Sequence, residues 1–151
     1  MVKKLSHTNQ SGRAVMVDVG EKPQSKRNAI AKGFIHLDRD TIQLIRNNLM
    51  KKGDVLSICE TAGIMAAKKT SELIPLCHNL YIEKIEVKAF LKKGGVQVEA
   101  MAKCTGKTGI EMEALTAVSV ALLTVYDMCK AVDKNMKIGD IVLIEKNKVA
   151  I

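Results

Sequence analysis

Two stretches near the start of the chain predict strands, and apolar and polar residues alternate in the first of them. Residues 13–19, RAVMVDV, alternate in this way, which predicts a short strand ending at Gly20. The polar stretch 21–28 contains Arg27 and a proline, and it predicts an exposed loop. Residues 29–37 are again rich in apolar side chains and predict a second strand.

Helical spacing of apolar residues replaces this alternation further along the chain. Asp38 or Asp40 is expected to cap a first helix, which ends at Gly53. Asp54 is expected to cap a second helix, which stops before Pro75. The apolar positions with this spacing are Ile42, Ile45 and Leu49 in the first helix and Val55, Ile58, Ala62, Met65 and Ala66 in the second. The second helix also has a side of small residues that another backbone can approach closely: Ala62, Gly63, Ala66 and Ala67.

A β-hairpin is predicted in the middle of the chain. Two alternating runs, residues 82–91 and 96–104, flank Gly94 and Gly95. Paired glycines supply the positive φ angles of a tight turn, so the two runs are expected to pair as neighbouring strands. Residues 105–109, TGKTG, then predict a loop.

The last third of the chain predicts one long helix and one strand. Residues 112–132 are apolar nearly all round, which is typical of a helix buried on most sides, and residues 138–144 predict the strand. The predicted order is therefore strand, helices, strand, strand, helix and strand after an N-terminal arm. This order is typical of an α+β, ferredoxin-like fold, an antiparallel sheet with helices packed on one face. We expect residues 1–151 to form a single domain.

The composition is that of a globular domain with an aliphatic core. Apolar residues make up 47% of the 151 residues, charged residues 26% and aromatic residues only 3%. The formal net charge of +8 favours an anionic partner. The basic residues are spread along the chain and few aromatic side chains are present to stack on bases, which argues against nucleic acid as that partner.

The cysteines and the N-terminus indicate the compartment. The four cysteines lie far apart and form no C-x-x-C pair, which argues for reduced thiols and against a zinc ribbon or a disulfide framework. The first ten residues lack the apolar run of a secretory signal. The charge-free run 114–126 is shorter than the roughly 20 residues of a membrane span. We therefore expect a cytoplasmic protein that does not interact with a membrane.

Cys77 and His78 stand next to each other in a segment expected to link a helix to a strand. Catalytic groups concentrate in such loops on a rigid scaffold, which favours a functional His78 over a purely structural one. A zinc site would need two further ligands at supporting spacing, and none is evident.

The segment TGKTGIEME, residues 105–113, is typical of an anion-binding loop before a helix. It is not a Walker A loop, because Met101 stands where that motif requires a glycine. Glu111 and Glu113 are favourable beside the helix dipole and would repel a phosphate. If these carboxylates contact a ligand, we expect them to accept hydrogen bonds from the N–H edge of a guanine or a pterin.

Asp127 and Lys130 lie three residues apart on the long predicted helix, on neighbouring positions of one face. An ordinary surface ion pair is one interpretation. The uncharged run before them favours another, in which this acid and base lie at the edge of a buried surface where pKa values shift. Lys52, before Gly53, is a further candidate.

Several stretches resemble the cyclic pyranopterin monophosphate synthase family, also called the molybdenum cofactor biosynthesis protein C family. They are MVDV at 16–19, KGDV at 52–55, AGIMAAKKTSELIPLCH at 62–78, TGKTGIEMEALTA at 105–117 and YDMCKAV at 126–132. The resemblance covers essentially the full chain. Two departures are visible: Asn79 follows the Cys-His pair where proline is frequent, and Ser25 stands where threonine is frequent.

The resemblance implies conversion of 3′,8-cyclo-7,8-dihydroguanosine 5′-triphosphate into cyclic pyranopterin monophosphate with release of pyrophosphate. It implies that Asp127 is the active-site acid and that Lys130 and Lys52 are catalytic lysines, and His78 can join them in proton transfer. Substrate contacts implied by the resemblance are Leu76, Cys77, His78, Met112 and Glu113, with Glu111 and Arg27 at associated positions. It further implies a nucleotide-derived small-molecule substrate, no cofactor and no metal, and a homo-oligomer, a hexamer built as a trimer of dimers.

Two other functions remain open from the residues alone. A basic ferredoxin-like module could bind RNA, although we expect the two central strands to offer only Phe90 for stacking on bases. A zinc-dependent GTP cyclohydrolase acting on a related nucleotide is the other alternative, and stoichiometric zinc in the purified protein would favour it.

The long helix also predicts that two subunits share one site. Glu113 and Asp127 lie fourteen residues apart, which is roughly 21 Å along a helix. No Gly or Pro within residues 112–132 breaks the helix. One nucleotide cannot easily span that distance, so we expect a second copy of the chain to complete the site.

Overall fold

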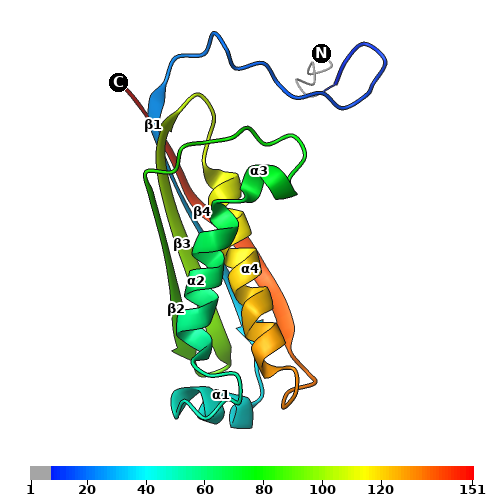
Figure 1. Cartoon of the computed structure of the whole chain (residues 1–151), viewed down its shortest axis with the longest axis vertical. Coiled ribbons are helices and arrows are strands. Elements are labelled where there is room, and N and C mark those ends of the chain that lie inside the picture. The colour runs from blue at the N-terminus through cyan, green and yellow to red at the C-terminus, as the bar shows by residue number, and fades with distance from the viewer. Residues whose placement is uncertain (1–7) are drawn as a thin grey trace.

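The computed structural model describes residues 8–151 and contains one four-stranded antiparallel sheet (Figure 1). In spatial order the strands are β2 (Lys84–Lys92), β3 (Gly95–Gly106), β1 (Ser25–His36) and β4 (Lys137–Ala150). The helices are α1 (Arg39–Arg46), α2 (Val55–Ala67), α3 (Thr70–Leu73) and α4 (Glu111–Cys129). The predicted α+β architecture and the predicted order of elements are therefore confirmed.

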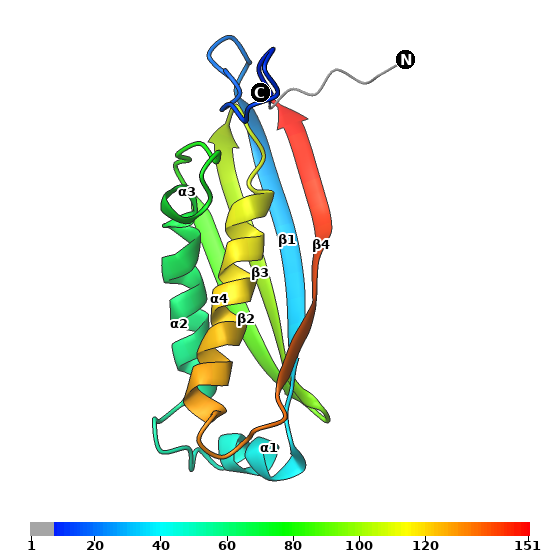
Figure 2. The same ribbon diagram turned by 90° about the vertical axis from the view of Figure 1, so that its right-hand side faces the viewer.

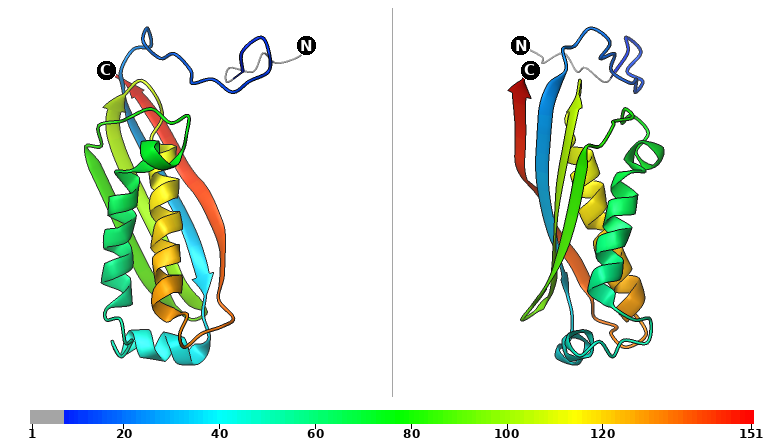
Figure 3. Two further views of the ribbon diagram at one scale, coloured as in Figure 1. Left: turned by 45° about the vertical axis from the view of Figure 1, so that its right-hand side comes forward. Right: turned by 60° about the vertical axis from the view of Figure 1, so that its left-hand side comes forward.

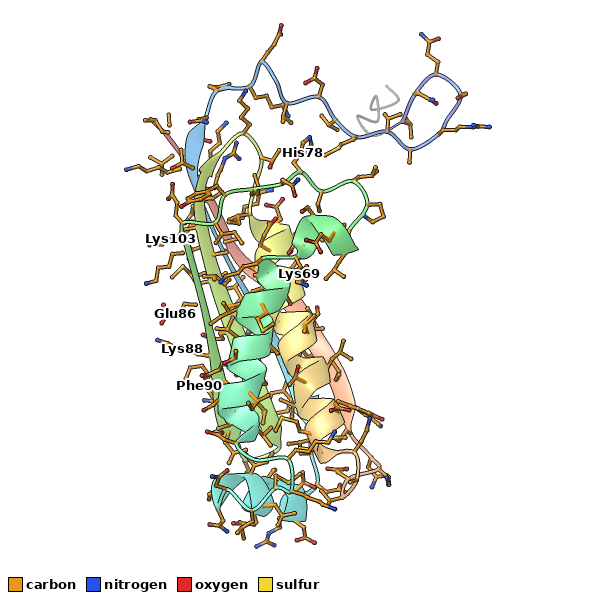
Figure 4. All side chains as sticks on the ribbon, viewed as in Figure 1. Lys69, His78, Glu86, Lys88, Phe90 and Lys103 are labelled. Atoms are coloured by element: carbon orange, nitrogen blue, oxygen red, sulfur yellow. The ribbon has the colours of Figure 1, made fainter. Side chains whose placement is uncertain are left out.

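Both long helices lie on one face of the sheet. Figure 2 shows α2 and α4 side by side on one side of the strands, and both views in Figure 3 agree. Within residues 8–151 no helix covers the other face. Figure 4 shows Glu86, Lys88, Phe90 and Lys103 on this open face, pointing away from the helices. Successive side chains of each strand therefore point alternately to the buried face, under the helices, and to the exposed face, which carries charge.

The buried face of β1 shows how closely the sheet and α4 pack. Ala29, Ala31 and Ile35 have no exposed surface, and Gly33 lies between them in the same register. A Cβ atom added at Gly33 would lie 2.7 Å from a Leu122 methyl group and 2.8 Å from a Val118 methyl group. Glycine is therefore required here for space, because α4 leaves no room for a larger side chain.

Helix α2 begins and packs as its sequence predicts. The Asp54 carboxylate accepts a hydrogen bond from the Ser57 backbone N–H at 3.1 Å, which is an N-cap. Gly63 faces α4, where an added Cβ would lie 3.0 Å from the Ala117 carbonyl oxygen. The small-residue side of α2 is thus the side on which the two helix backbones approach each other. Ile58 and Met65, predicted on the apolar side, are about half exposed.

Residues 13–19 do not form the predicted strand. They run extended above one end of the sheet, and among them only Ala14 makes a bridge, to Thr8. Their alternation has another origin, because Val17 and Val19 line a cavity near the start of α4. The first seven residues lie outside the described part of the chain. The prediction that the first ten residues form no secretory signal therefore falls mostly outside the described residues.

Several predicted boundaries also shift. Strand β1 begins at Ser25, so the end of the predicted loop 21–28 belongs to the sheet. The first helix ends at Arg46 rather than at Gly53, because Asn48 adopts a positive φ of 52° and Leu49 is exposed. The short helix α3 was not predicted. Strand β4 continues well beyond Ile144, and its pairing with β1 contains register shifts.

Helix α4 is long and apolar enough to cross a membrane by length and composition. In this chain it is the central core helix. Its Ala114, Ala117, Ala121 and Leu122 side chains have no exposed surface. The apolar character of α4 is therefore accounted for by packing against the sheet and α2.

Candidate active site

A cavity of about 230 Å³ lies at the end of the sheet where α4 begins. Four segments far apart in the sequence line it: the arm before β1, the loop after α3, the loop before α4 and the first turn of α4. The predicted substrate contacts Leu76, Cys77, His78, Glu111, Met112 and Glu113 all line this cavity. The structure therefore brings these predicted site residues together.

His78 is held by the N-terminal arm. Its Nε2 atom lies 2.7 Å from the Val17 carbonyl oxygen. Because a carbonyl oxygen only accepts hydrogen bonds, Nε2 donates, and in the neutral ring the lone pair is on Nδ1. The ring is half-buried and lines the cavity, and Figure 4 shows His78 between the N-terminal arm and α3. This fixed tautomer leaves Nδ1 as a base or an acceptor.

Glu113 is a buried carboxylate without a partner. Its side chain is 4% exposed, and its Oε2 atom is buried and makes no hydrogen bond within the described residues. Burial raises the pKa of Glu113, and the neighbouring Glu111 carboxylate raises it further. A buried polar atom with no partner in the folded chain is typical of a site that a ligand completes.

Glu111 differs from Glu113 in having a cation beside it. Glu111 Oε1 accepts a hydrogen bond from Lys146 Nζ at 2.6 Å, while Oε2 is buried and unpaired within the described residues. Lys146 lies on β4 beyond the end predicted for that strand, where no sequence pattern marks it. The two carboxylates therefore present two unpaired acceptor atoms at the start of α4.

Cys77 lines the same cavity as a neutral thiol. Burial raises its pKa, and the Glu113 and Glu111 carboxylates add to this effect. A thiol with a raised pKa is a poor nucleophile. Cys77 is therefore suited to contact a ligand and not to form a covalent bond with it.

Arg27 and Lys107 hold the loop before α4. The Arg27 guanidinium donates to the Lys107 carbonyl oxygen at 3.3 Å, and Lys107 Nζ donates to the Gly20 carbonyl oxygen at 2.5 Å. Arg27 Nε is buried with no hydrogen-bond partner in the described chain. The predicted role of Arg27 as a site residue stays a prediction, since it does not line the cavity itself.

The other three predicted catalytic residues meet at the opposite end of α4. Asp127 Oδ1 lies 2.6 Å from Lys130 Nζ, and its Oδ2 lies 2.7 Å from Lys52 Nζ. Lys130 and then Lys52 lower the pKa of Asp127 to about 2, and the Asp127 carboxylate raises the pKa of Lys130. All three side chains are about half exposed, so this carboxylate and its two ammonium groups are open to a ligand.

These two clusters do not meet within one chain. Glu113 and Asp127 both lie on α4, an unbroken helix, and are fourteen positions apart, which corresponds to roughly 21 Å along the helix. Figure 1 shows the two ends of α4 at opposite ends of the molecule. The candidate site therefore consists of two halves, a cavity with carboxylates and a cationic cluster around Asp127.

No group of three or more potential metal ligands occurs within residues 8–151. Besides Cys77 and His78, the described residues that line the cavity and could bind a metal are Glu111 and Glu113.

The fold and the site define a small α+β protein that separates an acidic, partly apolar cavity from an exposed lysine–aspartate cluster. The chain belongs to the MoaC family, whose model matches residues 16–148. The family resemblance stated from the sequence is thereby confirmed.

Curated relatives cover nearly the whole chain. A protein of Peptoclostridium acidaminophilum named cyclic pyranopterin monophosphate synthase is 56% identical over 142 residues, which are 94% of this chain and 90% of that protein. A protein of the same name from Clostridium acetobutylicum is 49% identical over 149 residues, 97% of this chain and 92% of that protein. The Heliobacterium modesticaldum protein of that name is 52% identical over 144 residues, 94% of this chain and 91% of its own length.

Proposed function

We propose that this chain is a cyclic pyranopterin monophosphate synthase of molybdenum cofactor biosynthesis. Its substrate is 3′,8-cyclo-7,8-dihydroguanosine 5′-triphosphate, and its products are cyclic pyranopterin monophosphate and pyrophosphate. The observation that carries the proposal is Glu113, a buried carboxylate with an unpaired oxygen in the cavity of a MoaC family member. The names of the curated relatives support the same activity.

Glu113 and Glu111 recognise the base. A guanine or pterin ring presents adjacent N–H donors, and a carboxylate only accepts, so the unpaired oxygens of both residues fit that edge. The apolar lining from Val17, Val19 and Met112 suits the faces of the ring. His78 offers its Nδ1 atom for a proton transfer at the ring.

The cluster around Asp127 serves the triphosphate and the proton transfers that rebuild the ring. Cyclisation joins a ribose hydroxyl oxygen to the innermost phosphorus, and the bond from that phosphorus to the pyrophosphate oxygen breaks. Lys52 and Lys130 stabilise the negative charge that develops on the phosphoryl oxygens. Asp127, with its pKa lowered to about 2, stays ionised and positions both ammonium groups. The proton of the attacking hydroxyl leaves with solvent or with the pyrophosphate.

A second copy of the chain completes each site. The roughly 21 Å between the halves in one chain exceeds the reach of one bound nucleotide held at both ends. Exposed apolar side chains support association: Ile141, Val142, Leu143 and Ile144 on β4, and Leu123 and Tyr126 on α4. We propose a homo-oligomer, a hexamer built from dimers, in which the cavity of one copy faces the Asp127 cluster of another.

We also propose that the enzyme works in the cytoplasm. Its four cysteines, Cys59, Cys77, Cys104 and Cys129, are free thiols, which is the usual state in a reducing compartment.

One assay tests the activity directly. Purified protein is incubated with the cyclised triphosphate, and pyrophosphate and pterin fluorescence after oxidation are followed together. We expect one pyrophosphate for each pterin formed. Turnover of GTP itself, together with stoichiometric zinc in the protein, would overturn the proposal in favour of a cyclohydrolase. Absence of both products with a folded protein would also overturn it.

A further inference from the structure

A buried carboxylate follows directly after α4. Asp133 is 1% exposed, although it belongs to the turn between α4 and β4. Its backbone N–H donates to the Cys129 carbonyl oxygen at 3.0 Å, which continues the helical path beyond the last residue of α4. Asp133 is therefore fixed relative to Asp127 and Lys130 by the helix itself.

The side chain of Asp133 binds the start of α1, at the other end of the sequence. Its Oδ2 atom accepts a hydrogen bond from the Asp38 N–H at 2.8 Å, and its Oδ1 accepts from the Asn135 N–H at 3.0 Å. The Thr41 side chain, on the first turn of α1, is also buried. A second bond, from Asn135 Nδ2 to Asp38 Oδ2 at 3.2 Å, joins the same two segments.

Helix α1 leads into the turn that carries Lys52. Two residues before Lys52, the side chain of Met50 is 7% exposed, and the Gly53 N–H donates to the Met50 carbonyl oxygen at 2.9 Å. The turn is thus anchored by burial on the α1 side. An ion pair with both side chains about half exposed, such as Lys52–Asp127, contributes little ordering by itself.

We propose that Asp133 is a positioning residue that holds α1 and its following turn so that Lys52 reaches Asp127. Asp133 acts through the backbone of Asp38 and makes no contact with substrate. Its replacement lets α1 move as a unit, because the carboxylate is the buried polar link between the end of α4 and the start of α1. The kinetic part of this inference rests on the function proposed above for Lys52, and the geometric part does not.

The geometric part is tested by NMR, without substrate. Asp127 is titrated through its side-chain carbon signal in the wild-type protein and in Asp133→Asn. The asparagine keeps the size of the side chain but cannot accept the Asp38 N–H on its amide nitrogen. We expect the pKa of Asp127, held at about 2 by Lys130 and Lys52, to rise toward its ordinary 3.8 as Lys52 withdraws. An unchanged pKa in a folded Asp133→Asn protein would overturn the inference.

Glu60→Gln is the matched control. Glu60 also uses a carboxylate oxygen to accept a backbone N–H, from Ala89 at 2.8 Å, but it joins α2 to β2 and not to the Asp127 cluster. This variant should leave the pKa of Asp127 unchanged, and an equal rise in both variants would show a general effect of lost stability and refute the inference. If Asp133→Asn does not fold, Asp38→Pro replaces it, since Asp38 already has a φ of −66° and proline removes only the N–H and the side chain.

A double-mutant cycle tests the kinetic part. If Asp133 acts through Lys52, then Asp133→Asn lowers kcat about tenfold or more in the wild-type background and has little further effect in Lys52→Ala. Equal losses in both backgrounds would overturn the positioning role. If Lys52→Ala itself retains full turnover while the pKa of Asp127 still rises in Asp133→Asn, the proposed catalytic role of Lys52 fails and the positioning of Lys52 by Asp133 stands.

Discussion

Glu113 and Asp127 lie at opposite ends of one unbroken helix, roughly 21 Å apart. The first is buried, unpaired and has a raised pKa, whereas the second is exposed, paired with two lysines and has a pKa of about 2. One helix thus carries two carboxylates whose environments push their pKa values in opposite directions. This difference supports the proposal that one end of α4 recognises the base and the other stabilises negative charge.

Removal of either lysine of the cluster should abolish most turnover. Lys52→Ala and Lys130→Ala each remove an ammonium group that stabilises phosphoryl charge, an effect commonly worth about a hundredfold or more. Because both side chains are about half exposed, the melting temperature should change little. Steady-state pyrophosphate release measures the loss. Lys88→Ala, on the open sheet face and paired with Glu86, is the control and should retain full activity. Wild-type rates in both cluster variants would refute their assignment.

Glu113→Gln should weaken substrate binding at neutral pH. The substitution keeps the size of the side chain but replaces one acceptor oxygen by an N–H donor, which faces the N–H edge of the base unfavourably. We expect a loss of affinity of about tenfold or more, measured by calorimetry with a non-hydrolysable substrate analogue. Equal affinities of the two proteins would mean that Glu113 serves only the helix dipole.

The same substitution should stabilise the protein at pH 7. The pKa of Glu113 is raised in the folded state, so its contribution to stability is fully present below pH 4.5, the ordinary value, and is lost as the pH rises through the raised pKa. Glutamine avoids that loss. We expect the melting temperature of Glu113→Gln to exceed that of the wild type by about 2–4 °C at pH 7 and the difference to vanish near pH 4. A constant difference at both pH values would contradict this explanation.

Gly33→Ala should destabilise the sheet–helix interface. The added methyl group would lie 2.7 Å and 2.8 Å from carbon atoms of Leu122 and Val118, so α4 must shift or strain. Overpacking of this kind costs about 1–3 kcal/mol of the free energy of unfolding. Urea denaturation measures it. Gly139→Ala is the control, because a Cβ atom at Gly139 meets nothing within 4 Å.

The fold was predictable where the pattern is local. The hairpin around Gly94 and Gly95 and the long buried helix follow from periods of two and of 3.6 residues, and both are present. The predicted turn differs in detail, because Lys93 and Gly94 form it and only Gly95 of the two glycines has a positive φ. The start of β1 was missed because Lys26 to Asn28 are polar and look like a loop. In the structure they belong to β1. Polar side chains fit in a strand when they lie on an uncovered face of the sheet or bind a neighbouring segment, as Arg27 binds the loop before α4.

The residues of the candidate site were likewise predictable where they lie in local motifs. Cys77, His78 and Glu113 lie in compact motifs, and the cavity unites them as predicted. Lys146 was missed because its contact with Glu111 depends on the irregular register of β4. Asp133 was missed because its partner Asp38 lies 95 residues away, and no local pattern marks a carboxylate that caps a distant helix. The aromatic residue on a central strand is Phe34, on β1, and it was overlooked. Phe90 lies on β2, which is at the edge of the sheet.

The last prediction concerns the sharing of one site by two subunits. Asp127→Asn disables the cationic half of the site, and His78→Ala disables the cavity half, so each protein alone should be inactive. In a mixed oligomer, some sites combine the intact cavity of an Asp127→Asn chain with the intact cluster of a His78→Ala chain. Random exchange at equal amounts places this combination in about one quarter of all sites, so activity should return to about that fraction of wild type. Exchange is verified by native mass spectrometry with chains of different mass, and each variant mixed with itself is the control. If exchange is complete and activity stays absent, both residues of every site come from one chain. The roughly 21 Å of α4 between the halves would then have to be bridged by the substrate or by a bend of the helix, neither of which the continuous helix Glu111–Cys129 favours.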